Sequence, residues 1–140
     1  LSLADSGAIE AALMAKLAGD SQLMLICTDG VYFGLSAKGK TRFVVVSLST
    51  SEDAAMFGGR AFEEDTYLVK AVLNESGATA ARNAATRMDG LVEGQPLTIS
   101  GYSHMVTQRV GRVRYPDPNP VNPDDLWQHA GGFYQVMASG

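Results

Sequence analysis

Apolar residues recur at helical spacing in two stretches of the chain. The first stripe consists of Ile9, Ala12, Leu13 and Leu17. Asp5 or Ser6 offers it a capping oxygen for the free N–H groups of the first turn, and Gly19 is a natural end. The second stripe consists of Ala81, Ala84, Ala85, Met88, Leu91 and Val92. Because Ser76 precedes it as a cap and Gly94 follows it as a stop, the pattern predicts two amphipathic helices that pack on a sheet.

Alternating or continuous apolar runs between these helices predict strands. The predicted strands cover residues 31–33, 43–48, 66–74, 97–99, 106–115 and 133–138. The clearest is 66–74, in which Tyr67, Val69, Ala71 and Leu73 share one face at a period of two. Segment 43–48 is apolar on both faces, which indicates a central strand or one covered by a neighbouring subunit.

Polar, glycine-rich or proline-rich segments join these strands. We expect a turn at 37–40 and two long loops, at 47–60 and 116–132. Four prolines in the second loop exclude a central strand there. Its Trp127, the single tryptophan, either folds back onto the core or anchors a partner, since tryptophan is common among interface hot spots.

Together these elements predict one α+β domain over residues 1–140, with a mixed or antiparallel sheet and two helices packed on one face. The chain has 140 residues, 46% of them hydrophobic, which suits a folded core. No apolar run approaches the roughly 20 residues of a membrane helix, so we expect no membrane partner. We also see no signal-peptide pattern.

Residue chemistry points away from catalysis. His104 and His129 lack a third ligand at metal-like spacing, and no GxSxG elbow or phosphate loop occurs. We therefore expect no catalytic residue, cofactor or metal. The single Cys27 lies in an apolar stretch, which indicates a buried structural thiol. A formal net charge of −4 argues against free binding to nucleic acid.

Charged residues gather in two places. An acidic group surrounds the first predicted loop and consists of Glu52, Asp53, Glu63, Glu64 and Asp65. It either solvates the loop or forms a negative surface facing something that must not adhere. The basic group, in the 106–115 strand, consists of Arg109, Arg112 and Arg114. If these arginines pair with carboxylates across a subunit boundary, they set register more than they add stability.

Several segments resemble a known family. They are 57–62 (FGGRAF) leading into 66–72 (TYLVKAV), 97–102 (LTISGY) and 127–136 (WQHAGGFYQV). With the intervening helix, they resemble the tail-completion, or tail-terminator, proteins of long-tailed bacteriophages and related gene-transfer particles. The resemblance covers nearly the whole chain in segment order, although none of its motifs carries chemistry.

The resemblance implies a structural virion protein of the tail or neck, assembled in the host cytoplasm. It implies a ring, six-fold in that family, that ends the tail tube, stops its polymerisation and presents a surface to the head connector (stopper) protein. DNA passes through such a ring without specific binding. We expect interface contacts at Trp127, Arg109, Arg112, Arg114 and Phe57. The five acidic residues, Glu52, Asp53, Glu63, Glu64 and Asp65, are the candidates for the lumen. The alternatives are another neck or minor tail component and, from a different class, a small-ligand-binding enzyme domain.

Overall fold

The computed structural model describes residues 6–34, 39–56, 59–119, 121–122 and 125–139, with the backbone alone at 6, 52–56 and 59–62. Within these residues, three helices and five strands follow one another. Their bounds are α1 Ser6–Ala18, α2 Ser21–Ile26, β1 Val31–Phe33, β2 Arg42–Met56, β3 Gly59–Asn74, α3 Thr79–Val92, β4 Ser103–Pro118 and β5 Leu126–Ser139. The predicted turn at 37–40 lies largely outside the described residues.

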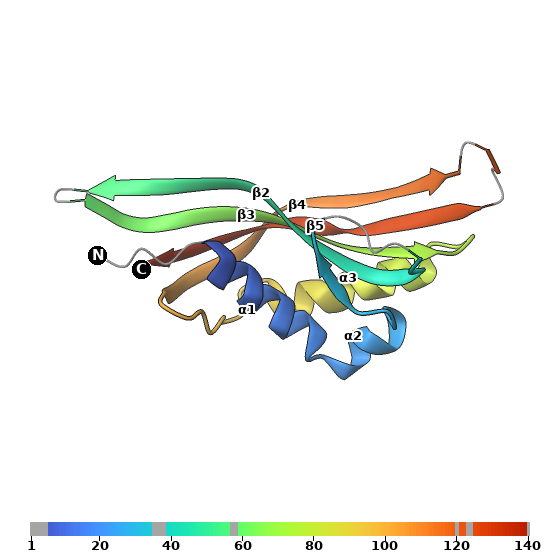
Figure 1. The fold of residues 1–140 in the computed structure, drawn as a ribbon, viewed down its shortest axis with the longest axis horizontal. Coiled ribbons are helices and arrows are strands. Elements are labelled where there is room, and N and C mark those ends of the chain that lie inside the picture. Colours follow the sequence, from blue (N-terminus) through green and yellow to red (C-terminus); the bar gives the residue numbers. More distant parts are fainter. Residues whose placement is uncertain (1–5, 35–38, 57–58, 120, 123–124, 140) are drawn as a thin grey trace.

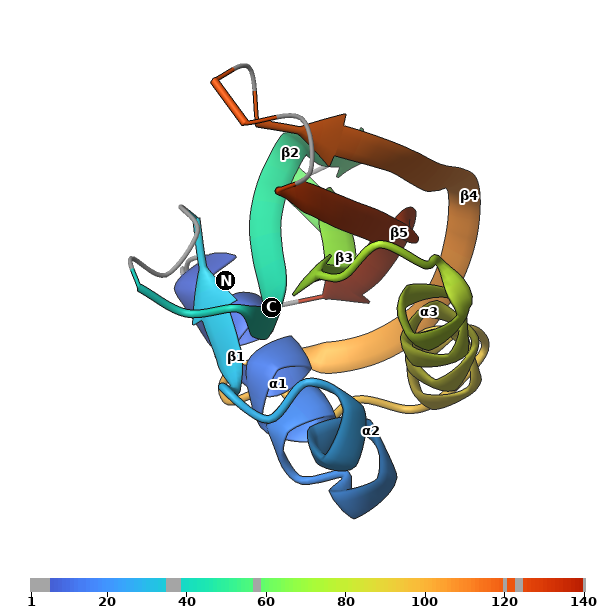
Figure 2. The same cartoon turned by 90° about the vertical axis from the view of Figure 1, so that its right-hand side faces the viewer.

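The strands form one sheet in the order β1-β2-β3-β5-β4. β1 runs parallel to β2, and the other neighbours are antiparallel, so the sheet is mixed. All three helices lie on one face of it (Figure 1). The strands are strongly twisted, and β4 curves around the side of α3 (Figure 2). The predicted α+β class is therefore confirmed, with one helix more than the sequence pattern indicated.

The main core lies between the helices and the sheet. The stripe of α1 is fully buried at Ile9, Leu13 and Leu17. It meets the predicted apolar face of β3 and, on α3, the small residues Ala81 and Ala84 with Met88 and Val92. Because alanines face the sheet, α3 can lie close to it. The periodicity that predicted these two helices is the periodicity that buries them.

A smaller cluster lies on the opposite face of the sheet. Phe43, Val45 and Val72 are buried there, with the partly buried Tyr32 and Trp127 packed against them. Val44 and Val46 point into the main core instead. The prediction that 43–48 is apolar on both faces is confirmed, and β2 is an inner strand of the sheet.

The predicted loop at 47–60 was wrong. β2 continues to Met56 and β3 starts at Gly59, so the segment forms the far end of a long antiparallel hairpin. Its outer part has no third strand, because the pairing of β3 with β5 begins only at Glu63. The polar part of the segment, residues 47–53, lies where β2 is an edge strand, because β1 pairs with β2 only at Val44–Val46. An edge strand with exposed positions needs no apolar alternation, which is why the polar sequence did not indicate a strand.

Three further expectations need correction. The second predicted loop is mostly strand: β4 extends to Pro118 and β5 begins at Leu126. Prolines are tolerated in β4 because it is an edge strand. Residues 97–99 form no strand, although Leu97 and Ile99 are buried. Helix α3 begins at Thr79, and its N-cap is Ala78 rather than Ser76.

The short helix α2 was not predicted, and it is held by an ion pair. Asp20 caps α2 by accepting a bond from the Leu23 N–H at 2.8 Å. The same carboxylate binds Arg87 of α3 through two hydrogen bonds of 2.8 and 2.6 Å. The hydrogen bonds from Arg87, opposed by desolvation and aided by the Leu23 N–H, lower the pKa of Asp20 from 3.8 to about 2. This carboxylate therefore ties α2 to α3 in its ionised form.

Asp20→Asn should lower the Tm at pH 7 by about 3 °C, because it removes the ion pair with Arg87 while asparagine can still cap α2. The folded pKa lies below the unfolded one, so the ionised carboxylate stabilises the fold above pH 3.8 and loses this effect as pH falls towards about 2. The Tm gap between wild type and variant should therefore shrink across that window in thermal scans. A gap that widened on acidification would contradict the assignment.

Candidate functional site

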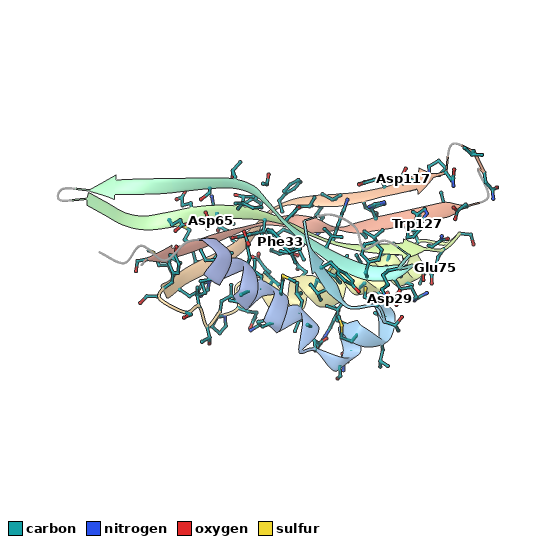
Figure 3. All side chains as sticks on the ribbon, viewed as in Figure 1. Asp29, Phe33, Asp65, Glu75, Asp117 and Trp127 are labelled. Atoms are coloured by element: carbon teal, nitrogen blue, oxygen red, sulfur yellow. The ribbon has the colours of Figure 1, made fainter. Side chains whose placement is uncertain are left out.

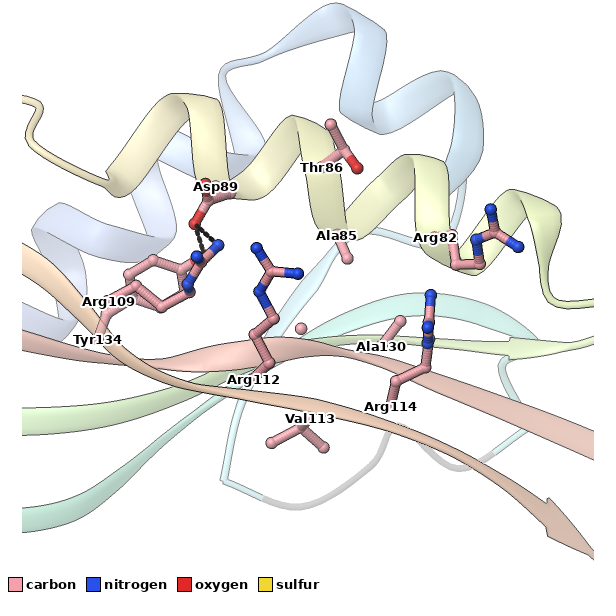
Figure 4. Close-up of a pocket in the computed structure, with 11 residues that line it drawn as sticks. Arg82, Ala85, Thr86, Asp89, Arg109, Arg112, Val113, Arg114, Ala130 and Tyr134 are labelled. Carbon is pink, nitrogen blue, oxygen red and sulfur yellow. Dashed lines mark hydrogen bonds and ion pairs between the residues drawn. The ribbon is translucent and has the colours of Figure 1, made fainter.

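A groove runs between helix α3 and edge strand β4, with β5 as its floor. It has a cavity volume of ≈ 660 Å³. The lining residues are Arg82, Ala85, Thr86 and Asp89 of α3, Arg109, Arg112, Val113 and Arg114 of β4, and Ala130, Gly131 and Tyr134 of β5. Arg112 and Arg114 extend from β4 towards α3, where Arg82 lies on the opposite wall (Figure 4). Four arginines thus converge on one side of a chain whose net charge is −4.

Small residues keep the groove open. Ala85 on the helix and Ala130 and Gly131 on the floor carry little side-chain volume. The alternation of β4 directs Arg112 and Arg114 to the helix side, opposite Gly132 and Ala130 of β5. A strand that presented large apolar residues at these positions would instead close the gap against α3.

One of the four arginines is already paired. Arg109 donates to Asp89 Oδ1 at 3.0 Å, and the Tyr134 hydroxyl donates to the same oxygen at 2.7 Å. Burial, together with the bond to Asp89, raises the pKa of Tyr134 and keeps its hydroxyl protonated. The backbone N–H of Arg109 also donates to Glu93. Arg109 is therefore a fixed element of the groove wall.

The other three arginines have no such partner. Arg82, Arg112 and Arg114 are exposed, and none makes a hydrogen bond or ion pair with a side chain that the structure describes. Guanidinium groups that converge repel one another unless an anion lies between them. Their planar forks bind carboxylate or phosphate through two parallel bonds. The arrangement is one that can bind a carboxylate or phosphate group.

The sequence identified three of these arginines but not their setting. Arg109, Arg112 and Arg114 lie together as expected for one strand, yet Arg109 pairs with Asp89 of α3 rather than with the acidic group of 47–60. Arg82 was missed, because it precedes β4 by more than twenty residues in the sequence. Only the packing of α3 on the sheet brings Arg82 to the same groove as the arginines of β4. A single basic residue on the polar face of a helix does not by itself indicate a binding groove.

The acidic candidates separate into two sets. Glu63 is only 6% exposed, its Oε2 accepting the Tyr102 hydroxyl at 2.6 Å, and Asp65 is fully buried. In the single chain these two carboxylates are not available to line a channel, because their strand turns them under the helices. Glu64 is half-buried on the other face. The side chains of Glu52 and Asp53 and the whole of Phe57 lie outside the described residues.

Trp127 lies in strand β5 rather than in a loop, at the opposite end of the sheet from Asp65 (Figure 3). Its ring is 6.4 Å from that of Phe43 and belongs to the smaller cluster. It therefore folds back onto its own chain while remaining partly exposed. Its place at an interface stays a prediction.

The histidines and the cysteine serve local structure. His104 accepts from the Leu97 N–H at 3.3 Å and contacts Thr107 Oγ1 at 2.7 Å. His129 stacks on Tyr115 with ring centroids 4.5 Å apart. Cys27 is buried and unpaired, and burial raises its pKa to about 12. Over the described residues no group of three His, Cys, Asp or Glu could hold a metal, and no helix is long and apolar enough to cross a membrane.

Comparisons with known proteins give a fold but no family. No family model matches the chain, and no curated protein sequence matches it. A solved chain from the virion of a native gene transfer agent (GTA) particle matches with a TM-score of 0.75 and 18% identity, over 99% of this chain and 100% of its own. A second solved structure matches with a TM-score of 0.53 and 14% identity, over 96% and 94%. The chain therefore shares its whole fold with a protein found in a GTA virion.

Proposed function

We propose that this chain is a structural virion protein that forms a closed ring in the neck of a siphophage-like or gene-transfer particle. The ring caps the tail tube, stops its polymerisation and joins it to the head connector. The observation that carries this proposal is the match along the full length of both chains to a protein of a GTA virion.

The edge of the sheet supports assembly. β4 is a strand of 16 residues at the end of the strand order, so its outer edge has no partner strand in the described part of the chain. It carries exposed apolar side chains, among them Met105 (51% exposed) and Val110 (54%). A long unpaired edge with exposed apolar side chains can pair with another chain, and the charges and prolines of β4 restrict which chain can do so. A monomer would leave this edge in water, whereas a neighbouring subunit would cover it.

A closed ring requires a head-to-tail contact between copies. An edge strand and a distant surface on the next copy form a head-to-tail contact, which closes into a ring when the rotation allows. A ring of six is what the family resemblance implies. One flat side of the ring would meet the tail tube and the other the connector, while DNA passes through the centre.

Deletion of the gene from the genome that encodes the particle tests the capping role. We expect headless particles and tail tubes of uncontrolled length, and normal tails when the wild-type gene is restored. A minor tail component would give tails of normal length that lack another activity, such as adsorption. That result, visible by electron microscopy, would replace the capping role with the other neck or tail function.

A further inference from the structure

Three guanidinium groups face the groove between α3 and β4 without an ionic partner among the described side chains. Arg82 lies on the α3 wall, and Arg112 and Arg114 lie on the β4 wall (Figure 4). All three are exposed, whereas the fourth arginine, Arg109, is held by Asp89 at 3.0 Å. Positive charge on both walls favours a ligand that enters between them and carries more than one negative charge.

The two arginines of β4 define a spacing for that ligand. Residues two apart in a strand lie on the same face, so Arg112 and Arg114 both point towards α3, with their Cα atoms roughly 6.6 Å apart. An extended peptide has the same period, so two acidic residues separated by one other residue match this pair. Each carboxylate can then accept two parallel bonds from one guanidinium fork.

The groove has room for such a segment. Its volume of ≈ 660 Å³ lies within the range of roughly 300–1,000 Å³ that is typical of ligand sites. Ala85 and Ala130 line it with small side chains, so a peptide backbone can lie close to the wall and the floor. The contact uses side chains on the helix side of β4 and not its outer main-chain edge. A neighbouring subunit at that edge and a segment in the groove can therefore bind together.

Phosphate-bearing ligands fit the groove less well. The phosphates of duplex DNA line the outside of a stiff double helix, whereas these guanidiniums point across the groove towards α3. The net charge of −4 also opposes the approach of DNA. A nucleotide needs an aromatic face on which its base can stack, and the one aromatic ring among the described lining residues, that of Tyr134, is only 2% exposed. Flexible carboxylate side chains do not meet these obstacles.

A second copy of this chain does not offer the matching segment. Acidic residues at alternate positions occur once in the sequence, as Glu63 and Asp65. They lie on β3, which pairs with β2 on one side and β5 on the other. Glu63 is 6% exposed and Asp65 is fully buried. The segment therefore comes from a different protein.

We propose that the arginine groove binds an extended acidic segment of another protein. Two carboxylates at alternate positions of that segment lie on Arg112 and Arg114, and Arg82 contributes a third positive charge from α3. The charge pairs fix the register of the contact. This inference deepens the proposed function and rests on it only for the source of the segment, which is another protein of the same particle.

Peptide binding to the purified chain tests the groove. The probe is a short fluorescein-labelled peptide in which two glutamates flank one serine, and the comparison peptide has glutamine in place of both glutamates. Fluorescence anisotropy should show at least about tenfold tighter binding of the glutamate peptide. This difference should shrink as the salt concentration rises above about 0.15 M, because exposed ion pairs are screened.

Substitutions in the groove locate the binding. Arg112→Gln/Arg114→Gln should weaken binding of the glutamate peptide at least about tenfold. Arg112→Lys/Arg114→Lys should restore only part of the affinity, because lysine keeps the charge without the planar fork. The matched control compares Arg112→Gln alone with Lys40→Gln, which makes the same change of charge at an exposed cation outside the groove and should bind normally. Unchanged Tm and circular dichroism establish that the variants are folded.

Several results would overturn the proposal. They are equal affinity for the two peptides, no binding of the glutamate peptide up to about 1 mM, and equal losses in Lys40→Gln and Arg112→Gln. Tighter binding of a labelled DNA duplex than of the glutamate peptide, lost in the same groove variants, would assign the groove to phosphate instead. Ring formation is measured separately by sedimentation. Peptide binding by a chain that forms no ring supports the groove contact and removes the ring, whereas rings from a chain that does not bind the peptide do the reverse.

Discussion

Gly131→Ala should destabilise the folded protein more than any single substitution on its surface. A Cβ at position 131 would lie 2.0 Å from the carbonyl oxygen of Val69 and 2.5 Å from the Cα of Lys70. Both are backbone atoms of β3, so no side-chain rotation relieves the clash, and β5 must move away from its partner strand. We expect a loss of about 3 kcal/mol or more in the free energy of unfolding.

Gly90→Ala is the control for this change. Gly90 lies exposed in α3, with no atom within 4 Å of the position that a Cβ would take. Alanine there should raise stability by about 0.5–1 kcal/mol, because glycine is a poor helix former. Denaturant titration of both variants measures the difference. If Gly131→Ala proved as stable as wild type, β3 and β5 would not approach as closely as the structure shows.

Val110→Asp should abolish assembly while the folded subunit survives. Val110 lies at an irregularity of the β4–β5 register, between Arg109 and Gly111, and is 54% exposed on the unpaired edge strand. A carboxylate there would be desolvated when a neighbouring subunit covers the edge. We expect at least about a tenfold loss of self-association by sedimentation.

Val121→Asp provides the comparison, because Val121 is 92% exposed and lies in the connection between β4 and β5. It should leave assembly unchanged, and both variants should keep the wild-type Tm. Equal assembly of the two variants would show that the β4 edge is not an interface.

The parts of the fold that the sequence predicted are those in which burial imposes a period. Ile9, Leu13 and Leu17 had to face the sheet, and Tyr67, Val69, Ala71 and Leu73 had to face the helices. Their spacing therefore reported both the type of element and its buried face. Gly94 ended α3 as expected, since its φ of 67° suits glycine.

The parts that escaped prediction have no regular apolar period of their own. The polar stretch 47–53 of β2 lies at a sheet edge beyond β1, where no apolar alternation is required. The middle of β5 contains Gly131 and Gly132, which weaken a strand pattern but are required where the backbones of β3 and β4 approach. Leu97 and Ile99 alternate like a strand, yet they only fill the core.

The sequence indicated only part of the groove, because the rest of it depends on tertiary packing. The three arginines of β4 stood out as a run, but Arg82 and the open space between β4 and α3 arise from tertiary packing. Only the structure shows that three of four guanidiniums lack a partner among the described side chains.

Negative-stain imaging of the purified protein, alone and with tail tubes, tests the central claim most directly. The account predicts closed cyclic rings of one subunit thickness, six-fold if the family resemblance extends to stoichiometry, that bind the ends of tubes. A strictly monomeric protein at high concentration, still monomeric when tubes are present, would contradict it.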